Sequence, residues 1–538
     1  MRRIATFFAA LIAVSLLAAV TLVGLAHSAS RANASAASSD QFGKVDFPTS
    51  CSAQAQPAIE RGVAQLHSFQ YQQSESTFTE ASQTDSQCAI AHWGRAMSLY
   101  HQLWDFPDAD TLAKGRGYAA DAQKLAPKTA READYVAAAA AFYQDNSKLS
   151  HTARVEAYTA AMEKLHRDFP TDTEGSAFYA LALVSLAYDE DELVNRKKAI
   201  AILDPLFEQY PDNPGVAHYL IHATDTPELA PQGLAAARQY ARIAPDSSHA
   251  IHMPSHIFTR LGLWQESIDS NIAAAAAAAR ATEAHLADAD YQLHPMDFLN
   301  YAYLQSGQEA KARQVVADLK NVPGASADDV AEHESWFSAR TAVESRHWKE
   351  AATLTPHDVN GEPQGSTYFA RVVGSARSGD VQGARAAIKK LNEAISVQRT
   401  HAKHMGYGSS SGESVEQQEA QAWLKFAEGK SEEAVKILRA AADREDASGV
   451  DSVLIPAREM LADLLLELKR PSESLAAYRI ALKESPNRFD ALWGAAQAAQ
   501  SAGDAGAAKS YYAKLVEVSG PGADRPELQE ARGYLASK

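Results

Sequence analysis

Two histidine pairs with identical spacing are the feature that most limits how this sequence can fold. His218 and His222 recur as His252 and His256 after an interval of 34 residues. Within each pair the i, i+4 spacing puts both rings on one face of a helix. An interval of this length is typical of a two-helix repeat that stacks on its neighbours. The sequence therefore predicts repeated helix pairs that carry histidines on one surface.

Length and composition agree with a helical array. The chain has 538 residues, whereas single hydrophobic cores stop growing near ~250–300 residues. Alanine is abundant and strand-type runs of Val, Ile and Thr are scarce, which predicts an all-α fold. The formal net charge of −16, without a basic stripe, argues against nucleic-acid binding and against attraction to anionic lipid.

The N-terminus has the order of an export signal. Arg2 and Arg3 precede an apolar run, Ile4–Ala26, and small polar residues follow. We expect residues 1–28 to be a signal peptide or, because the run of about 23 residues can span a bilayer, an N-terminal anchor. Residues 29–50 are expected to form a disordered lead-in. The protein is thus predicted to be exported, periplasmic or secreted, with membrane contact only through an uncleaved N-terminal segment.

The chain has two cysteines, Cys51 and Cys88. In an oxidising compartment an even number favours a disulfide, and two buried thiols are the alternative. No CxxC or Cys/His finger spacing occurs, which excludes haem attachment and cysteine-ligated structural zinc.

Small and aromatic residues recur at fixed places in the terminal repeats. We number each 34-residue repeat from 1 to 34. With Pro486 at position 32, Ala462 takes position 8, Tyr478 position 24 and Ala481 position 27. Small residues let paired helices approach, while the aromatic ring fills the cleft between neighbouring pairs. We expect an N-terminal and central array over residues 51–354, an irregular pair with loop-rich breaks over 355–413, and C-terminal repeats over 414–538.

On these positions the chain resembles tetratricopeptide repeat (TPR) proteins over nearly all of residues 50–538. The segments FPTSC, RGVAQLHSF, CAIAHWGRAM and HMPSHIFTRLGLW, and the run from PAREMLADLLLEL to PNRFDALWGAA, resemble a group of exported bacterial TPR proteins with no assigned function. The resemblance implies a right-handed TPR-like α-solenoid of about 10–12 helix pairs. It also implies that the first helix of each pair lines a concave groove that binds a peptide or protein.

Carrying the family's groove positions onto this sequence selects residues on three successive first helices. They are His218, His222 and Asp225, then His249, His252 and His256, then His294, Asp297 and Tyr301. Pro254 is expected either to kink its helix or to begin it, because proline fits a first turn but not a helix interior. In the second case His249 and His252 would precede the helix.

Histidine pairs from two packed helices can supply four ligands to zinc or another divalent metal. The predicted ligands are His218, His222, His252 and His256, with Asp225 or Asp297 as a further ligand or a base. An open coordination position would permit hydrolysis. The alternatives are a hydrogen-bonded polar lining that binds a peptide, and acid–base catalysis without metal.

Trp93 and Met97 also fall on groove positions, so they predict an aromatic and sulfur-containing docking patch. Core packing is the alternative for large side chains at helical spacing. We see no phosphate loop, nucleophile elbow or dinucleotide fingerprint. The sequence thus favours an exported TPR scaffold that binds through its groove rather than an enzyme. A metal-binding protein or metal-dependent hydrolase, with catalytic residues not identified, is the second hypothesis.

Overall fold

The computed structural model describes residues 41–103, 106–144, 149–186, 192–359, 361–404, 413–448 and 455–537. The expected signal peptide or anchor, most of the expected lead-in and the turn-rich residues 405–412 lie outside the described residues. Within the described ranges, no helix combines the length and the apolar character needed to cross a bilayer.

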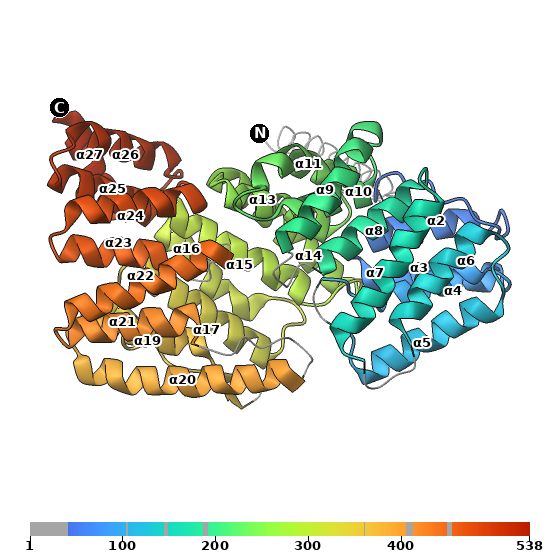
Figure 1. Cartoon of the computed structure of the whole chain (residues 1–538), viewed down its shortest axis with the longest axis horizontal. Coiled ribbons are helices and arrows are strands. Elements are labelled where there is room, and N and C mark those ends of the chain that lie inside the picture. Colours follow the sequence, from blue (N-terminus) through green and yellow to red (C-terminus); the bar gives the residue numbers. More distant parts are fainter. Residues whose placement is uncertain are drawn as a thin grey trace, which may run out of the picture. The chain divides into compact units, whose positions relative to one another are not determined.

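The described residues are arranged almost entirely in helices (Figure 1). The N-terminal helices are α2 (Gln56–His67), α3 (Tyr71–Thr84), α4 (Ala89–Met97), α5 (Ala109–Lys124), α6 (Ala130–Phe142), α7 (His151–Asp168), α8 (Thr173–Ser185) and α9 (Glu192–Gln209). The central helices are α10 (Pro214–Thr224), α11 (Ala230–Ile243), α12 (Ser248–His252), α13 (Pro254–Arg260), α14 (Trp264–Glu283), α15 (Asp290–Gln305), α16 (Glu309–Asp318), the 3-10 helix η1 (Leu319–Asn321), α17 (Ala327–Glu344) and α18 (Trp348–Ala351). Strands β1 (Asp358–Val359) and β2 (Glu362–Pro363) then form a short antiparallel hairpin. The remaining helices are α19 (Gly365–Arg377), α20 (Val381–His404), α21 (Val415–Ala427), α22 (Ser431–Ser448), α23 (Ala457–Glu467), α24 (Pro471–Glu484), α25 (Phe489–Ser501), α26 (Ala505–Val518) and α27 (Pro526–Ala536).

Helices pack in pairs along the chain, so the fold is an all-α, TPR-like solenoid. The close approach depends on small residues that face an aromatic ring. A Cβ atom added to Gly94 would lie 2.3 Å from the ring of Phe78, and one added to Gly494 would lie 2.2 Å from Tyr478. Both rings are fully buried. The aromatic residues of the repeat pattern therefore fill the clefts between helix pairs.

The stretch from Phe42 onward is one compact unit, which crosses the boundaries expected at 354/355 and 413/414. The irregular pair expected over 355–413 contains instead the regular pair α19 and α20, preceded by the hairpin. One buried apolar cluster has members on both sides of these boundaries, from Ala339 to Ala508. The turn formers at 355–359 and 361–367 therefore lie between packed helices rather than at the end of a core.

The first repeat packs back onto the middle of the chain, since α2 contacts α10. His67 lies at the end of α2, and its ring nitrogens contact Tyr219 Oη at 2.9 Å and Glu174 Oε2 at 2.8 Å. A disulfide joins Cys51, ahead of α2, to Cys88 at the start of α4. The N-terminal repeats therefore form a wall beside α10.

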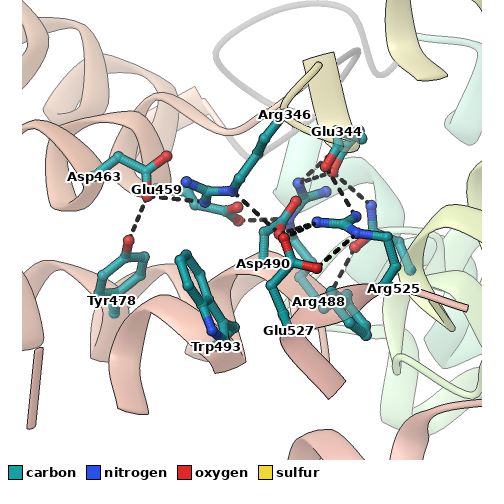
Figure 2. Close-up of polar contacts among 12 residues, drawn as sticks. Glu344, Arg346, Glu459, Asp463, Tyr478, Arg488, Asp490, Trp493, Arg525 and Glu527 are labelled. Atoms are coloured by element: carbon teal, nitrogen blue, oxygen red, sulfur yellow. Dashed lines mark hydrogen bonds and ion pairs between the residues drawn. The ribbon is translucent and has the colours of Figure 1, made fainter. Parts of the chain in front are cut away.

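The last repeats also return to the middle of the chain, through a buried ionic network (Figure 2). Arg488 is fully buried and lies 2.8 Å from Glu344, 2.7 Å from Glu459 and 2.6 Å from the Tyr301 hydroxyl. The neighbouring Arg525 contacts Asp490 at 3.0 Å. Because unpaired buried charges are costly, these contacts fix α25 against α15 and α17.

Candidate functional site

Helix α10 carries the first histidine pair. The helix begins at Pro214, which suits a first-turn position, and the Asn213 side chain caps it by accepting a hydrogen bond from the backbone N–H of Val216. His218 and His222 follow on one face, both buried, with ring centroids 4.7 Å apart. The i, i+4 spacing therefore brings the two rings together as the sequence predicts.

Pro254 divides the second histidine segment into two short helices. His249 and His252 lie on α12, and a new helix, α13, begins at Pro254 and carries His256. The proline thus begins a helix rather than kinking one, which is the second of the two outcomes expected for it. His249 and His252 nevertheless remain helical, because α12 forms one turn of its own with Ser247 as its cap.

Six histidines gather in two adjacent groups. His218, His222 and His249 form the inner histidine triad, and His252, His256 and His294 form the outer histidine triad. In each triad one ring nitrogen from every residue lies within 4.8 Å of the others. The prediction of one centre made by His218, His222, His252 and His256 is therefore wrong. The break at Pro254 turns His249 toward α10 and leaves His252 beside His256.

Hydrogen bonds on the far side of the rings orient the outer triad. Asn271 on α14 donates from Nδ2 to the carbonyl oxygen of Ser267 at 2.8 Å, so its Oδ1 is free to accept. His252 donates from Nδ1 to this oxygen at 2.7 Å. His256 donates from Nδ1 to Asp225 Oδ2 at 2.8 Å. The Nε2 atoms of His252 and His256 then face each other, 3.0 Å apart.

A backbone carbonyl orients the inner triad. His218 donates from Nδ1 to the carbonyl oxygen of His67 at 2.6 Å, and its Nε2 lies 3.1 Å from Nε2 of His249. The phenyl ring of Phe69 contacts all three inner rings, with centroid distances of 4.4 Å to His218, 5.7 Å to His222 and 5.3 Å to His249. The first repeat therefore supplies both a hydrogen-bond acceptor and a cover for this triad.

Burial keeps the rings in the state that binds metals. It lowers the pKa of His218 to about 3 and that of His294 to about 4, although His294 lies exposed on the wall of a cavity. Burial opposes ionisation of Asp225, but the charge of Arg260 and the His256 ring outweigh it and hold the pKa of this carboxyl well below its usual value. A carboxylate hydrogen-bonded to the far nitrogen of the ring, as Asp225 is to His256, is the usual arrangement behind a metal-binding histidine.

The outer triad opens onto a cavity of about 980 Å³. Phe69 and Tyr71 line it on the N-terminal side, and Trp336 and Ile395 line it on the C-terminal side. His256 and His294 also line a second cavity of about 320 Å³. These volumes suit a small molecule or a peptide segment. A ligand in the larger cavity would therefore meet the outer triad directly.

The remaining predicted groove residues occupy this wall in different ways. Asp297 accepts hydrogen bonds through Oδ1 from Trp336 Nε1 at 3.0 Å and from Arg340 Nη1 at 2.5 Å. Tyr301 lines the smaller cavity, but its hydroxyl contacts Arg488. Both residues therefore face the groove while being held by neighbouring helices.

The prediction that Trp93 and Met97 form a docking patch is wrong. Their exposed fractions are 1% and 0%. Phe47, from the segment ahead of α2, stacks on Trp93 with ring centroids 5.5 Å apart. Tyr135 packs edge-on against the same ring. The N-terminal segment and α6 thus cover a helix face that repeat counting alone assigns to the groove.

Three contributors to the site escape sequence reasoning. Asn271 lies just ahead of the alanine run of α14, and the only signal in the sequence is this single amide near the alanines. The structure shows that it is buried. Phe69 and the His67 carbonyl oxygen come from the first repeat, about 150 residues before His218 in the chain, and repeat counting gives no indication of this contact.

Comparison with protein-family models gives no match, and comparison with curated proteins gives none either. Solved structures with a similar arrangement include the human IFIT1 dimer with m7Gppp-AAAA, at 13% identity and a TM-score of 0.35, covering 80% of this chain and 90% of that chain. They also include yeast Tom70, at 11% identity and a TM-score of 0.27, covering 90% of this chain and 96% of that chain. Similarity at this level gives no information about what this chain binds.

Proposed function

We propose that this is an exported binding protein whose groove holds a divalent transition metal, such as zinc, on His252, His256 and His294. The coordination positions that remain open face the large cavity, where a peptide or other small ligand binds beside the ion. Imidazole nitrogen ligands suit zinc, copper, nickel and iron rather than magnesium or calcium.

The observation that carries the proposal is the distance of 3.0 Å between the Nε2 atoms of His252 and His256. Both rings already use their Nδ1–H groups as donors, to Asn271 and to Asp225. In neutral rings the two Nε2 lone pairs therefore point at each other, which is repulsive. A cation between them removes the repulsion, and two nitrogen ligands with zinc bonds of ~2.0–2.1 Å lie ~3.0–3.4 Å apart.

The carboxylates near the outer triad support binding better than hydrolysis. Asp225 uses one oxygen for His256 and the other for Arg260. Asp297 accepts from Trp336 and Arg340 through Oδ1. A carboxylate engaged through both oxygens, as Asp225 is, orients a ligand and balances charge, whereas a general base needs an oxygen that can take a proton from a bound water. We therefore propose a metal-containing binding groove rather than a metallohydrolase.

Export is supported by the sequence order of Arg2, Arg3 and the apolar run Ile4–Ala26. The disulfide between Cys51 and Cys88 agrees with an oxidising compartment. Detection of the protein in the periplasmic or secreted fraction, with its mature N-terminus identified by mass spectrometry, tests this part of the proposal.

Metal analysis of the full chain tests the site. The protein is stripped with a chelator, loaded with Zn²⁺, desalted, and measured by inductively coupled plasma mass spectrometry. We expect His294→Ala, at an exposed position, to hold one ion fewer than the wild type while keeping its helical circular dichroism. His333→Gln is the matched control, since His333 lines the same cavity but belongs to neither triad.

Two results would contradict the proposal. Wild-type protein that stays free of metal after loading would show that the outer triad does not hold the ion. Equal metal content in wild type and His294→Ala would show that the ion binds elsewhere.

A further inference from the structure

We infer that the inner histidine triad, His218, His222 and His249, holds a second transition-metal ion. This site goes beyond the proposed function, because it shares no ligand with the outer triad. Two helices supply the three rings, and one nitrogen of each lies within 4.8 Å of the others. The ligand set is purely imidazole, which suits zinc or copper.

The hydrogen bond of His218 fixes which atom it offers. A backbone carbonyl only accepts, so the contact of 2.6 Å to the His67 oxygen requires a proton on Nδ1 of His218. In the neutral ring Nε2 then carries the lone pair, and it points to Nε2 of His249 at 3.1 Å. This spacing agrees with two neighbouring ligands on one ion, for which ~3.0–3.4 Å is expected.

A buried carboxylate holds His67, the residue whose backbone carbonyl oxygen orients His218. Glu174 is fully buried and contacts His67 Nε2 at 2.8 Å. The carbonyl of the same His67 holds His218. The carbonyl contact itself orients the ligating His218, whereas Glu174 acts on the triad only through His67. The inner triad therefore has an organised surrounding of its own.

Phe69 closes the inner triad. Its φ is +54°, in the left-handed region, and Gly262 takes the equivalent place in the later repeat with the same pair of turn hydrogen bonds. The ring that this conformation positions covers all three inner histidines. Arg346 and Lys469 take the same conformation in equivalent turns, so the conformation belongs to the repeat, and it is the position of the Phe69 ring that serves the triad.

The two sites are neighbours. Ring centroids are 6.1 Å apart for His222 and His256 and 6.2 Å apart for His249 and His252. The groove would therefore hold a pair of ions, the outer one facing the large cavity and the inner one behind it, where His249 alone of its three ligands lines that cavity.

The test counts ions in the full chain loaded with Zn²⁺ and desalted. We expect two ions per wild-type chain, one in His222→Phe, one in His294→Ala, and none in the double variant. Phenylalanine at 222 keeps a ring against Phe69, and circular dichroism in the presence of chelator checks that each variant is folded. His333→Gln is expected to retain both ions.

The possible outcomes separate this inference from the proposed function. One ion in the wild type, lost in His294→Ala but kept in His222→Phe, would overturn the second site and leave the first intact. No ion in the wild type would overturn both, and two ions in His222→Phe would place the second elsewhere. If His222→Phe does not fold, anomalous diffraction from zinc-loaded wild-type crystals decides, since the inference requires a peak among the three inner rings.

Discussion

Arg488 and Glu344 form a two-pronged ion pair across 144 residues of sequence, with Nη2 2.8 Å from Oε1 and 2.9 Å from Oε2 (Figure 2). Neither side chain has more than 1% of its surface exposed. The pair connects the start of α25 to the end of α17. The C-terminal repeats are therefore fixed to the central ones through buried charges, which water cannot hydrate if the pair is broken.

Arg488→Met is expected to lower the free energy of unfolding by about 3–5 kcal/mol, because it removes the cation that the buried Glu344 and Glu459 share. Arg488→Lys should recover only part of this loss, since one ammonium nitrogen cannot replace the three that contact Glu344, Glu459 and Tyr301. Urea denaturation followed by circular dichroism measures the change. Arg439→Met is the control, because Arg439 pairs with Glu473 at the exposed surface and should matter by about 0.5 kcal/mol or less. Equal effects at the two positions would contradict the role given to the buried network.

Asp225→Asn is expected to weaken zinc binding at the outer triad about 10–100-fold, the usual effect of changing a residue that orients a ligand. The amide is neutral and holds His256 and Arg260 less well than the carboxylate does. Competition with a chromophoric chelator measures the affinity. Asp246→Asn, at an exposed carboxylate, should leave it unchanged. An unaltered affinity in Asp225→Asn would mean that this carboxylate does not support the ion.

The repeat interval predicts the helices of the site well, because small and aromatic residues at fixed spacing report local packing. It places His218 and His222 on one helix and brings His256 and His294 to the same wall. It does not predict that the histidine rings form two separate triads, because this depends on whether Pro254 kinks a helix or begins one. Sequence alone gives both outcomes.

Contacts between distant repeats could not be predicted in the same way. They depend on how far the superhelix of repeats rotates along the chain, which is set by the sum of many small helix-packing angles. Examples are the cover that Phe69 provides, the His67 acceptor and the Arg488 network. Trp93 shows the same limit, because Phe47 covers it from a segment outside the repeats. A repeat pattern thus locates a surface without showing what else packs on it.

Reducing the disulfide between Cys51 and Cys88 is expected to destabilise the N-terminal repeats by about 3–4 kcal/mol, as the chain-entropy relation gives for a loop of this length. The unfolding temperature of the wild type should fall when a phosphine reductant is added. The double variant Cys51→Ser, Cys88→Ser should melt at the lower temperature with or without reductant. Two free thiols in the unreduced protein, titrated after denaturation, would contradict the prediction.

Glu419 and Glu445 give the protein a stability that depends on pH. Burial raises the pKa of Glu445 from 4.5 to about 7, and burial with the neighbouring Glu445 and Glu416 raises the pKa of Glu419 well above its usual value. A carboxyl whose pKa is higher in the folded state favours folding when protonated. Its contribution is complete below pH 4.5 and is lost as the pH rises through 7.

Glu419→Gln mimics the protonated carboxyl at every pH, so its advantage over the wild type should grow as the pH rises. We expect the two proteins to unfold with similar free energies at pH 5 and the variant to be the more stable one at pH 8, because the wild type has to ionise a buried carboxyl as the pH rises. Taking the difference between the proteins removes the contributions of groups that do not interact with Glu419, so the trend reports the interacting pair of Glu419 and Glu445. Glu517→Gln, at an exposed position, should show no such trend. A constant difference between Glu419→Gln and the wild type from pH 5 to pH 8 would show that Glu419 is ionised in the folded protein throughout this range.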